Sequence, residues 1–193
     1  MSSARSYASW LAVTIGCVSA SAIAQAGNRT ALTDMHLTVL TYDRNMGKRG
    51  DDTSVTLGVV FNPESAVSER DAKSIGGDFA SSGLNIKLNK RQVNAVLVAW
   101  RGDNMKQELR AGKVDLLYLA ADTWEQLDEI KSVAAQLKVP TMAGSQSMVS
   151  AGIALGVIAG DSGPQILINR KAARAQGMYL DARVYRHATL INE

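Results

Sequence analysis

Three short apolar runs constrain the fold of this chain more than any other feature. They cover residues 54–61, 93–100 and 114–119, and all are rich in valine or leucine. Runs of this length and composition are typical of strands buried on both faces of a sheet. Helical patterns lie between and after them. Because close alternation of strands and helices favours parallel pairing, the sequence predicts an α/β fold with a mostly parallel sheet flanked by helices.

Cap residues predict where two of these helices begin. Asn62 can cap a helix over residues 64–81, with Pro63 at its first position. Thr123 and Gln126 have the spacing of a capping box. A helix with one apolar stripe follows them, which is the pattern of a helix packed on a core. The stripe consists of Leu127, Ile130, Ala134 and Leu137.

The C-terminal third predicts a β-hairpin followed by closing helices. Residues 151–159 and 164–169 are apolar, and Asp161, Ser162 and Gly163 between them are typical turn residues. Small side chains dominate one face of the first strand, so a helix or a second backbone can approach that face closely. These small residues are Gly152, Ala154, Gly156 and Gly160.

The closing helices are predicted from caps and stop signals. Asn169 can cap a helix over residues 170–176, and Gly177 can end it. A last helix is predicted over residues 181–190. With the hairpin, these helices complete the predicted architecture of a single domain.

The amino terminus has the pattern of a cleavable secretory signal. Arg5 is the only charge before Arg29, residues 10–18 are apolar, and small residues follow. The apolar run is too short to span a bilayer. The sequence therefore predicts a leader over residues 1–26 and one periplasmic domain over residues 27–193, which does not itself span the membrane once the leader is cleaved.

Cysteine chemistry depends on this leader. Cys17 is the only cysteine, so cleavage leaves a mature domain without a thiol or a disulfide. Two alternatives stay open at this point: an apolar segment retained as an anchor, and a lipid attached to Cys17.

Catalytic and metal signatures are missing from the sequence. Residues 160–164, GDSGP, are similar to the serine segment of trypsin-like proteases, but a tight turn explains them better. His36 and His187 have no second ligand at helical metal spacing. We therefore expect no catalytic residue, no metal and no cofactor, and we interpret the chain as a non-enzyme.

Charge gives no sign of a nucleic-acid partner. The formal net charge is only +3. The densest basic cluster, formed by Lys87, Lys90 and Arg91, has no aromatic residue interleaved with it, so it is interpreted as a solvated face.

One polar cluster is the candidate binding site. Residues 28–45 fit a helix, which we favour, although the alternation over residues 36–42 also fits a strand. Tyr42, Asp43, Arg44 and Asn45 follow, beside a glycine-containing loop. Such a position often presents binding groups on a rigid scaffold, so these residues are candidates for contact with a partner. The alternative is a cluster of caps and ion pairs that orders the loop.

A family resemblance rests on three C-terminal segments. Residues 152–158 read GIALGVI, residues 163–169 read GPQILIN, and residues 172–177 read AARAQG. This series resembles the last third of the YfiR-like family of small periplasmic proteins, which has a glycine-flanked apolar strand, a hairpin ending in asparagine and a short helix stopped by glycine. The structural motif positions here are Gly152, Gly156, Gly163, Asn169 and Gly177.

The resemblance implies a regulatory role and a membrane partner. Family repressors bind the periplasmic sensing domain of an inner-membrane diguanylate cyclase and hold it inactive, so a diguanylate cyclase or a histidine kinase is the implied partner. It also implies the capacity to form a homodimer. The cysteine pairs of some members are missing here, which argues against a thiol switch. The alternative is a small-ligand-binding domain resembling half of a periplasmic solute-binding protein, with its ligand at the carboxyl ends of the strands.

Overall fold

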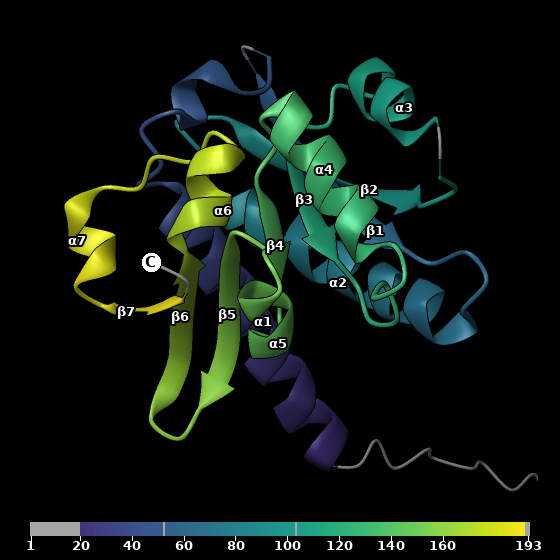
Figure 1. The fold of residues 1–193 in the computed structure, drawn as a ribbon. Helices are drawn as coiled ribbons and strands as arrows, with labels where there is room; N and C mark the ends of the chain where they lie inside the picture. Colours follow the sequence, from purple (N-terminus) through teal and green to yellow (C-terminus); the bar gives the residue numbers. More distant parts are fainter. Residues whose placement is uncertain (1–19, 52, 103, 192–193) are drawn as a thin grey trace, which may run out of the picture.

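The fold is a single twisted sheet covered by helices, as seen in a computed structural model that describes residues 20–51, 53–102 and 104–191 (Figure 1). The sheet has 7 strands in the order β2-β1-β3-β4-β5-β6-β7. Strands β2, β1, β3, β4 and β5 pair in parallel, β6 is antiparallel to β5, and β7 is parallel to β6. The prediction of a mostly parallel sheet is confirmed. The strands are β1 (Ser54–Phe61), β2 (Gln92–Ala99), β3 (Leu116–Leu119), β4 (Thr141–Ala143), β5 (Leu155–Gly160), β6 (Gly163–Asn169) and β7 (Ala188–Ile191).

Helices cover both faces of the sheet and create two cores. Leu37 of α1 and Phe79 of α2 belong to one buried cluster, whereas Leu109 of α3 and Ile130 of α4 belong to the other. The sheet therefore lies between two helical layers. The helices are α1 (Ala20–Leu40), η1 (Met46–Lys48), α2 (Ala66–Asn85), α3 (Met105–Ala111), α4 (Leu127–Leu137), α5 (Gln146–Ser150), α6 (Arg170–Ala175) and α7 (Ala182–Tyr185).

The first segment is the helix that we favoured, and His36 fixes it to the sheet. The Nδ1 atom of His36 is 2.9 Å from the Leu32 carbonyl, and Nε2 accepts a hydrogen bond of 3.2 Å from the Val157 N–H of β5. Burial lowers the pKa of His36 to about 4, so the ring is neutral, as accepting from a backbone N–H requires. The rings of Phe79 and Tyr118 pack edge-on against it.

The predicted hairpin is confirmed, but its first strand begins at Leu155, so Gly152 and Ala154 of the predicted small face precede the strand. The register pairs Gly160 with Gly163, which leaves Asp161 and Ser162 as the turn. The small face of β5 also has the expected consequence: a Cβ atom at Gly156 would lie 2.6 Å from the Val149 side chain of α5. The helix therefore packs directly on the backbone of the strand.

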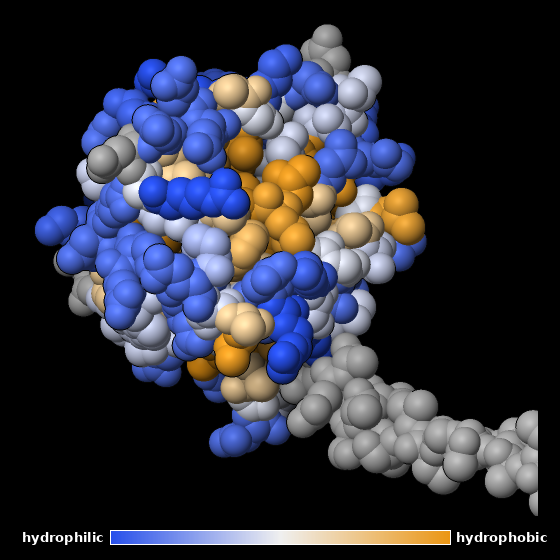
Figure 2. All heavy atoms as spheres, turned by 90° about the vertical axis from the view of Figure 1, so that its right-hand side faces the viewer, coloured by the Kyte–Doolittle hydropathy of each residue, from blue (hydrophilic) through white to orange (hydrophobic). Residues whose placement is uncertain are grey.

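Strand β2 corrects one expectation. Residues 93–100 do form a strand, but it lies at the edge of the sheet instead of inside it. Its Val96 and Leu97 side chains are 40% and 44% exposed. Figure 2 faces this side of the molecule and shows an apolar area on it.

The chain end and two caps also differ from the predictions. The last helix ends at Tyr185, and residues 188–191 instead add β7 to the open edge of β6. Ser65, not Asn62, caps α2, because the Ser65 hydroxyl accepts from the Ser68 N–H. The Thr123 hydroxyl donates to the Ala120 carbonyl and caps nothing.

The leader lies mostly outside the described residues. Residues 1–19, including Cys17, are not described, and residues 20–26 belong to α1. The cleavable signal over residues 1–26 therefore stays a prediction. None of the described helices is long and apolar enough to cross a bilayer.

Candidate functional site

The structure places the predicted cluster Tyr42–Asn45 against the C-terminal segment. The Arg44 N–H donates to the Tyr179 carbonyl at 3.0 Å, and the Asp181 N–H donates to the Tyr42 carbonyl at 3.0 Å. A β-bridge joins Asp43 and Leu180 between these bonds. The end of α1 and the segment before α7 are thus tied together by main-chain pairing.

Asp43 is the polar centre of this junction. Its side chain is buried, and Oδ1 accepts from the Asn45 N–H at 3.0 Å and from the Tyr179 N–H at 2.9 Å. Its Oδ2 lies 3.6 Å from Nε of Arg49. Oδ2 forms no hydrogen bond among the described residues, so the Arg49 charge is what balances it. Asp43 therefore organises the backbone from a buried position and is not free to meet a partner.

Arg49 extends the junction to two further segments. Its guanidinium donates to the carbonyls of Lys138 at 2.5 Å and Gly177 at 2.7 Å. Asn45 Nδ2 donates to the same Gly177 carbonyl at 2.9 Å. Burial lowers the pKa of Arg49 below its usual value, although the nearby carboxylates of Asp43 and Asp115 act in the opposite direction. We call Asp43, Asn45, Arg49 and Gly177 the clasp.

The clasp leaves an exposed face of two tyrosines and two arginines. Tyr42 and Tyr179 are 37% and 53% exposed. The side chains of Arg44 and Arg183 are 72% and 64% exposed, and both approach the Asp181 carboxylate, at 3.4 and 3.0 Å. The Arg183 guanidinium also lies 5.1 Å from the centre of the Tyr42 ring. We call Tyr42, Arg44, Tyr179 and Arg183 the Tyr–Arg face.

Sequence reasoning found half of this face. Tyr42 and Arg44 were candidates for partner contact, and the structure exposes them, while Asp43 and Asn45 of the same cluster point into the clasp. Tyr179 and Arg183 were missed. No local pattern connects them to Tyr42, because only the long-range pairing brings the two segments together.

The family motif residues shape the backbone at separate places. Gly152, Gly163 and Gly177 have φ angles of +115°, +129° and +73°, which side chains rarely tolerate. Asn169 caps α6 through a 3.0 Å bond from the Ala172 N–H, as predicted. Its amide also donates to the Val149 carbonyl at 2.9 Å, which joins α5 to α6.

A separate hollow lies at the carboxyl ends of β3 and β4. It has a volume of about 280 Å³, and we call it the carboxyl-end hollow. Arg29 of α1 and Asp71 of α2 line it, 4.0 Å apart. Gly144 leaves space for Tyr118, because a Cβ atom there would lie 2.8 Å from the tyrosine oxygen. Burial raises the pKa of Tyr118, so this hydroxyl stays protonated and can donate. The remaining polar residues of the lining are Thr33, His36 and Ser145.

The described residues form no evident catalytic or metal constellation. Both ring nitrogens of His36 already bond to the backbone, so this histidine cannot activate a serine. Ser162 lies in the exposed turn of the hairpin. Within the described ranges, no three side chains of His, Cys, Asp or Glu are grouped to hold a metal ion.

Comparison with protein families identifies a match over most of the chain. The profile of the YfiR/HmsC-like family matches residues 62–189, which include the clasp residue Gly177 and all five motif positions. A search of curated protein sequences finds no match.

Solved structures share the fold at low sequence identity. A conserved domain protein from Vibrio cholerae matches with a TM-score of 0.56 and 14% identity, over 83% of this chain and 60% of that one. An ABC domain in complex with L-Trp from Streptococcus pneumonia matches with a TM-score of 0.57 and 12% identity, over 83% and 62%. A substrate binding protein with adhesive properties from Clostridium difficile matches with a TM-score of 0.53 and 16% identity, over 71% and 54%. The chain thus spans between 54% and 62% of the length of these proteins.

Proposed function

Since the chain belongs to the YfiR/HmsC-like family, we propose that it is a non-catalytic periplasmic regulator that docks on the outer domain of an inner-membrane sensor protein. The sensor is a diguanylate cyclase, with a histidine kinase as the other candidate. Docking shifts the sensor towards its inactive state without any chemistry on this chain, and the synthesis of cyclic-di-GMP falls. The predicted leader over residues 1–26 supports the periplasmic location.

The single observation that carries this proposal is the Tyr–Arg face. Tyrosine and arginine are enriched among the residues that dominate binding energy at protein interfaces. Here Asp43 holds the Tyr179 N–H, the Tyr179 carbonyl holds the Arg44 N–H, and Asp181 holds the Arg183 N–H, so little backbone entropy is lost when a partner binds.

Charge defines the surface that fits this face. Arg44 and Arg183 share one carboxylate, Asp181, so the face is positively charged. The exposed cations Lys48 and Arg174 lie nearby, on the rim of a hollow that also includes Tyr179. The complementary partner surface therefore carries acidic residues and an apolar contact for the tyrosine rings.

A binding measurement tests this docking. The purified protein is titrated by calorimetry with the periplasmic domain of an inner-membrane diguanylate cyclase from the same organism. Replacing both Arg44 and Arg183 by Ala should weaken binding by about tenfold or more, since each is an exposed interface arginine. Arg101→Ala is the matched control, because Arg101 is an exposed cation that follows β2 at the opposite edge of the sheet from α7 and β7. Equal affinity of the double variant and the control would refute docking through this face.

The carboxyl-end hollow supports a second candidate function, the binding of a small solute. In open α/β sheets, ligands bind outside the carboxyl ends of the strands, and this hollow offers Arg29, Asp71 and Tyr118 there. An amino acid fits these groups, with its carboxylate on Arg29 and its ammonium on Asp71. L-Trp, the ligand of the Streptococcus pneumonia protein, is the first probe. Saturable binding heat in a calorimetric titration would support this function, provided that Arg29→Ala abolishes this heat and Arg101→Ala preserves it. No heat from L-Trp or the other common amino acids would exclude it.

A further inference from the structure

A second hollow lies at the opposite ends of the strands, where β3 and β4 begin. It has a volume of about 460 Å³, and we call it the amino-end hollow. Val114 and Asp115 line it directly before β3, and Val139 lines it two residues before β4. The other sides come from the loop after α1, the end of α4 and the end of α6. The hollow shares Lys48, Arg174 and Tyr179 with the proposed docking surface, but docking does not require a ligand inside it.

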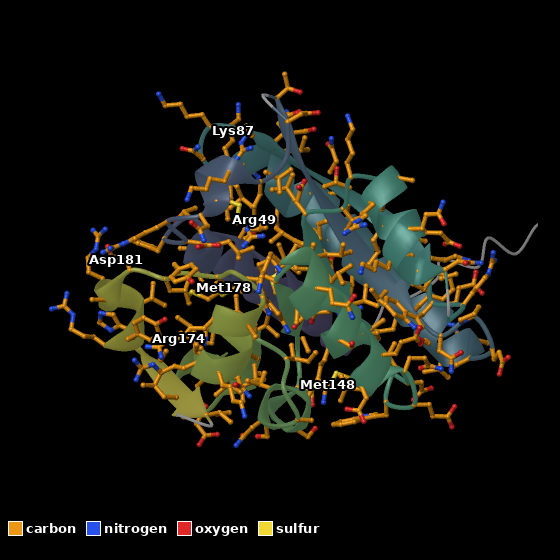
Figure 3. The ribbon with its side chains drawn as sticks, turned by 45° about the horizontal axis from the view of Figure 1, so that its top comes forward. Arg49, Lys87, Met148, Arg174, Met178 and Asp181 are labelled. Carbon is orange, nitrogen blue, oxygen red and sulfur yellow. The ribbon has the colours of Figure 1, made fainter. Side chains whose placement is uncertain are left out.

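Cations outnumber acids in the lining. Lys48, Arg49, Lys138 and Arg174 contribute four positive charges, and Asp115 contributes the only negative one. In Figure 3, Arg49 and Arg174 are labelled on two different segments of the chain. Because one carboxylate cannot balance four cations, a bound anion would reduce the repulsion among them.

The acids of the neighbourhood are already engaged. Asp115 accepts the Gly50 N–H on Oδ1 at 2.7 Å and the Thr56 N–H on Oδ2 at 2.8 Å. Asp43 forms its ion pair with Arg49, and no other cation among the described residues pairs with it. Among the described residues, Lys48 and Arg174 form no ion pair, and the Lys138 ammonium donates to the neutral Ala175 carbonyl at 2.9 Å. Two exposed cations therefore stay available to an anion in the hollow.

The loop that carries Lys48 and Arg49 is held in place before any ligand arrives. Buried Arg91 donates to the carbonyls of Met46, Arg49 and Asp51 and so fixes the loop from below. Arg49 is fixed in turn by the clasp. The backbone beneath Lys48 and the guanidinium of Arg49 are thus in place before an anion arrives, which lowers the entropic cost of ordering this side of the hollow.

The walls of the hollow leave room for more than an inorganic ion. Leu137, Val114 and Val139 line one part, and the half-exposed Tyr179 ring lines another. We propose that the amino-end hollow binds a phosphate monoester, with its dianionic phosphate among Lys48, Arg49, Lys138 and Arg174 and its organic part against Tyr179 and the aliphatic wall. Phosphate suits this set better than a carboxylate does, because its three terminal oxygens and double charge match several cationic donors at once.

The phosphate monoester could be a soluble metabolite or a lipid headgroup, and one experiment distinguishes them. The protein is titrated at constant ionic strength with phenyl phosphate, with benzoate as the singly charged ring control, and with vesicles of phosphatidylcholine with and without phosphatidic acid. We expect saturable binding of phenyl phosphate, about tenfold or more tighter than that of benzoate. Binding to phosphatidic acid vesicles without binding to phenyl phosphate supports the same phosphate chemistry with a lipid as its source.

Matched variants locate the site. Replacing Lys48 and Arg174 together by Ala should reduce the affinity about tenfold or more, while Lys87→Ala leaves it unchanged. All three side chains are exposed, and Lys87, labelled in Figure 3, is not part of the lining. Unchanged thermal unfolding of the double variant confirms that it still folds. The proposal is overturned if neither phosphate probe binds, if benzoate binds as tightly, or if the double variant binds as tightly as the unaltered protein.

Discussion

Removal of the Asp43 carboxylate should destabilise the fold more than removal of any exposed charge would. Asp43→Ala leaves the N–H groups of Asn45 and Tyr179 without their acceptor and leaves Arg49 without its counter-ion. Breaking a buried ion pair from one side costs about 3–5 kcal/mol. Arg49 keeps its bonds to the carbonyls of Lys138 and Gly177, so we expect the low end, a loss of about 3 kcal/mol.

Urea unfolding at pH 7 measures this loss, and two variants separate its causes. Asp43→Asn keeps an oxygen that can accept from the two N–H groups but removes the charge, so its loss should be about half as large. Arg44→Ala is the control for a nearby exposed ion pair, and it should lose less than about 1 kcal/mol. A loss below about 1 kcal/mol for Asp43→Ala would refute the clasp as the element that orders this junction.

Three further changes test other parts of the fold. His36 has a pKa of about 4 in the folded protein against about 6.5 unfolded, so the unfolded chain binds its proton first as the pH falls. The free energy of unfolding should therefore drop by up to about 3 kcal/mol between pH 6.5 and 4, and urea titrations of His36→Gln should lack this part of the drop. Gly77→Ala should stabilise the protein by about 0.5–1 kcal/mol, because no atom lies within 4 Å of the added methyl group in α2. Gly156→Ala should cost about 1–3 kcal/mol, because the methyl group meets Val149; equal thermal shifts for the two glycine variants would contradict this difference in packing.

The features that the sequence predicts correctly are those that depend on residues close together in the chain. The runs at β1 and β3, the stripe of α4, the turn at Asp161 and Ser162 and the cap at Asn169 all depend on neighbours in the chain. Each was confirmed for that reason.

The features that were missed depend on distant partners. Residues 188–191 form β7 because β6 offers an open edge, which no nearby residue indicates. The exposure of β2 follows from its position at the end of the strand order. The bond by which His36 joins α1 to the sheet could not be seen in the sequence either, because the Val157 N–H of β5 lies far along the chain.

The candidate site was predicted in part for the same reason. The cluster Tyr42–Asn45 is visible in the sequence, but its division into buried and exposed members is set by Tyr179 and Asp181, which lie far along the chain. In the structure, Asp43 and Asn45 order the loop, whereas Tyr42 and Arg44 are exposed. Contact of these two exposed residues with a partner stays a prediction.

The rate of cyclic-di-GMP synthesis decides whether the Tyr–Arg face restrains a sensor. A full-length diguanylate cyclase from the same organism is reconstituted in lipid nanodiscs and assayed with and without the purified protein. We expect the protein to lower the rate, the Arg44→Ala and Arg183→Ala double variant to leave it unchanged, and Arg101→Ala to lower it like the unaltered protein. An unchanged rate with the unaltered protein, or an equal reduction by the double variant, would contradict regulation through this face.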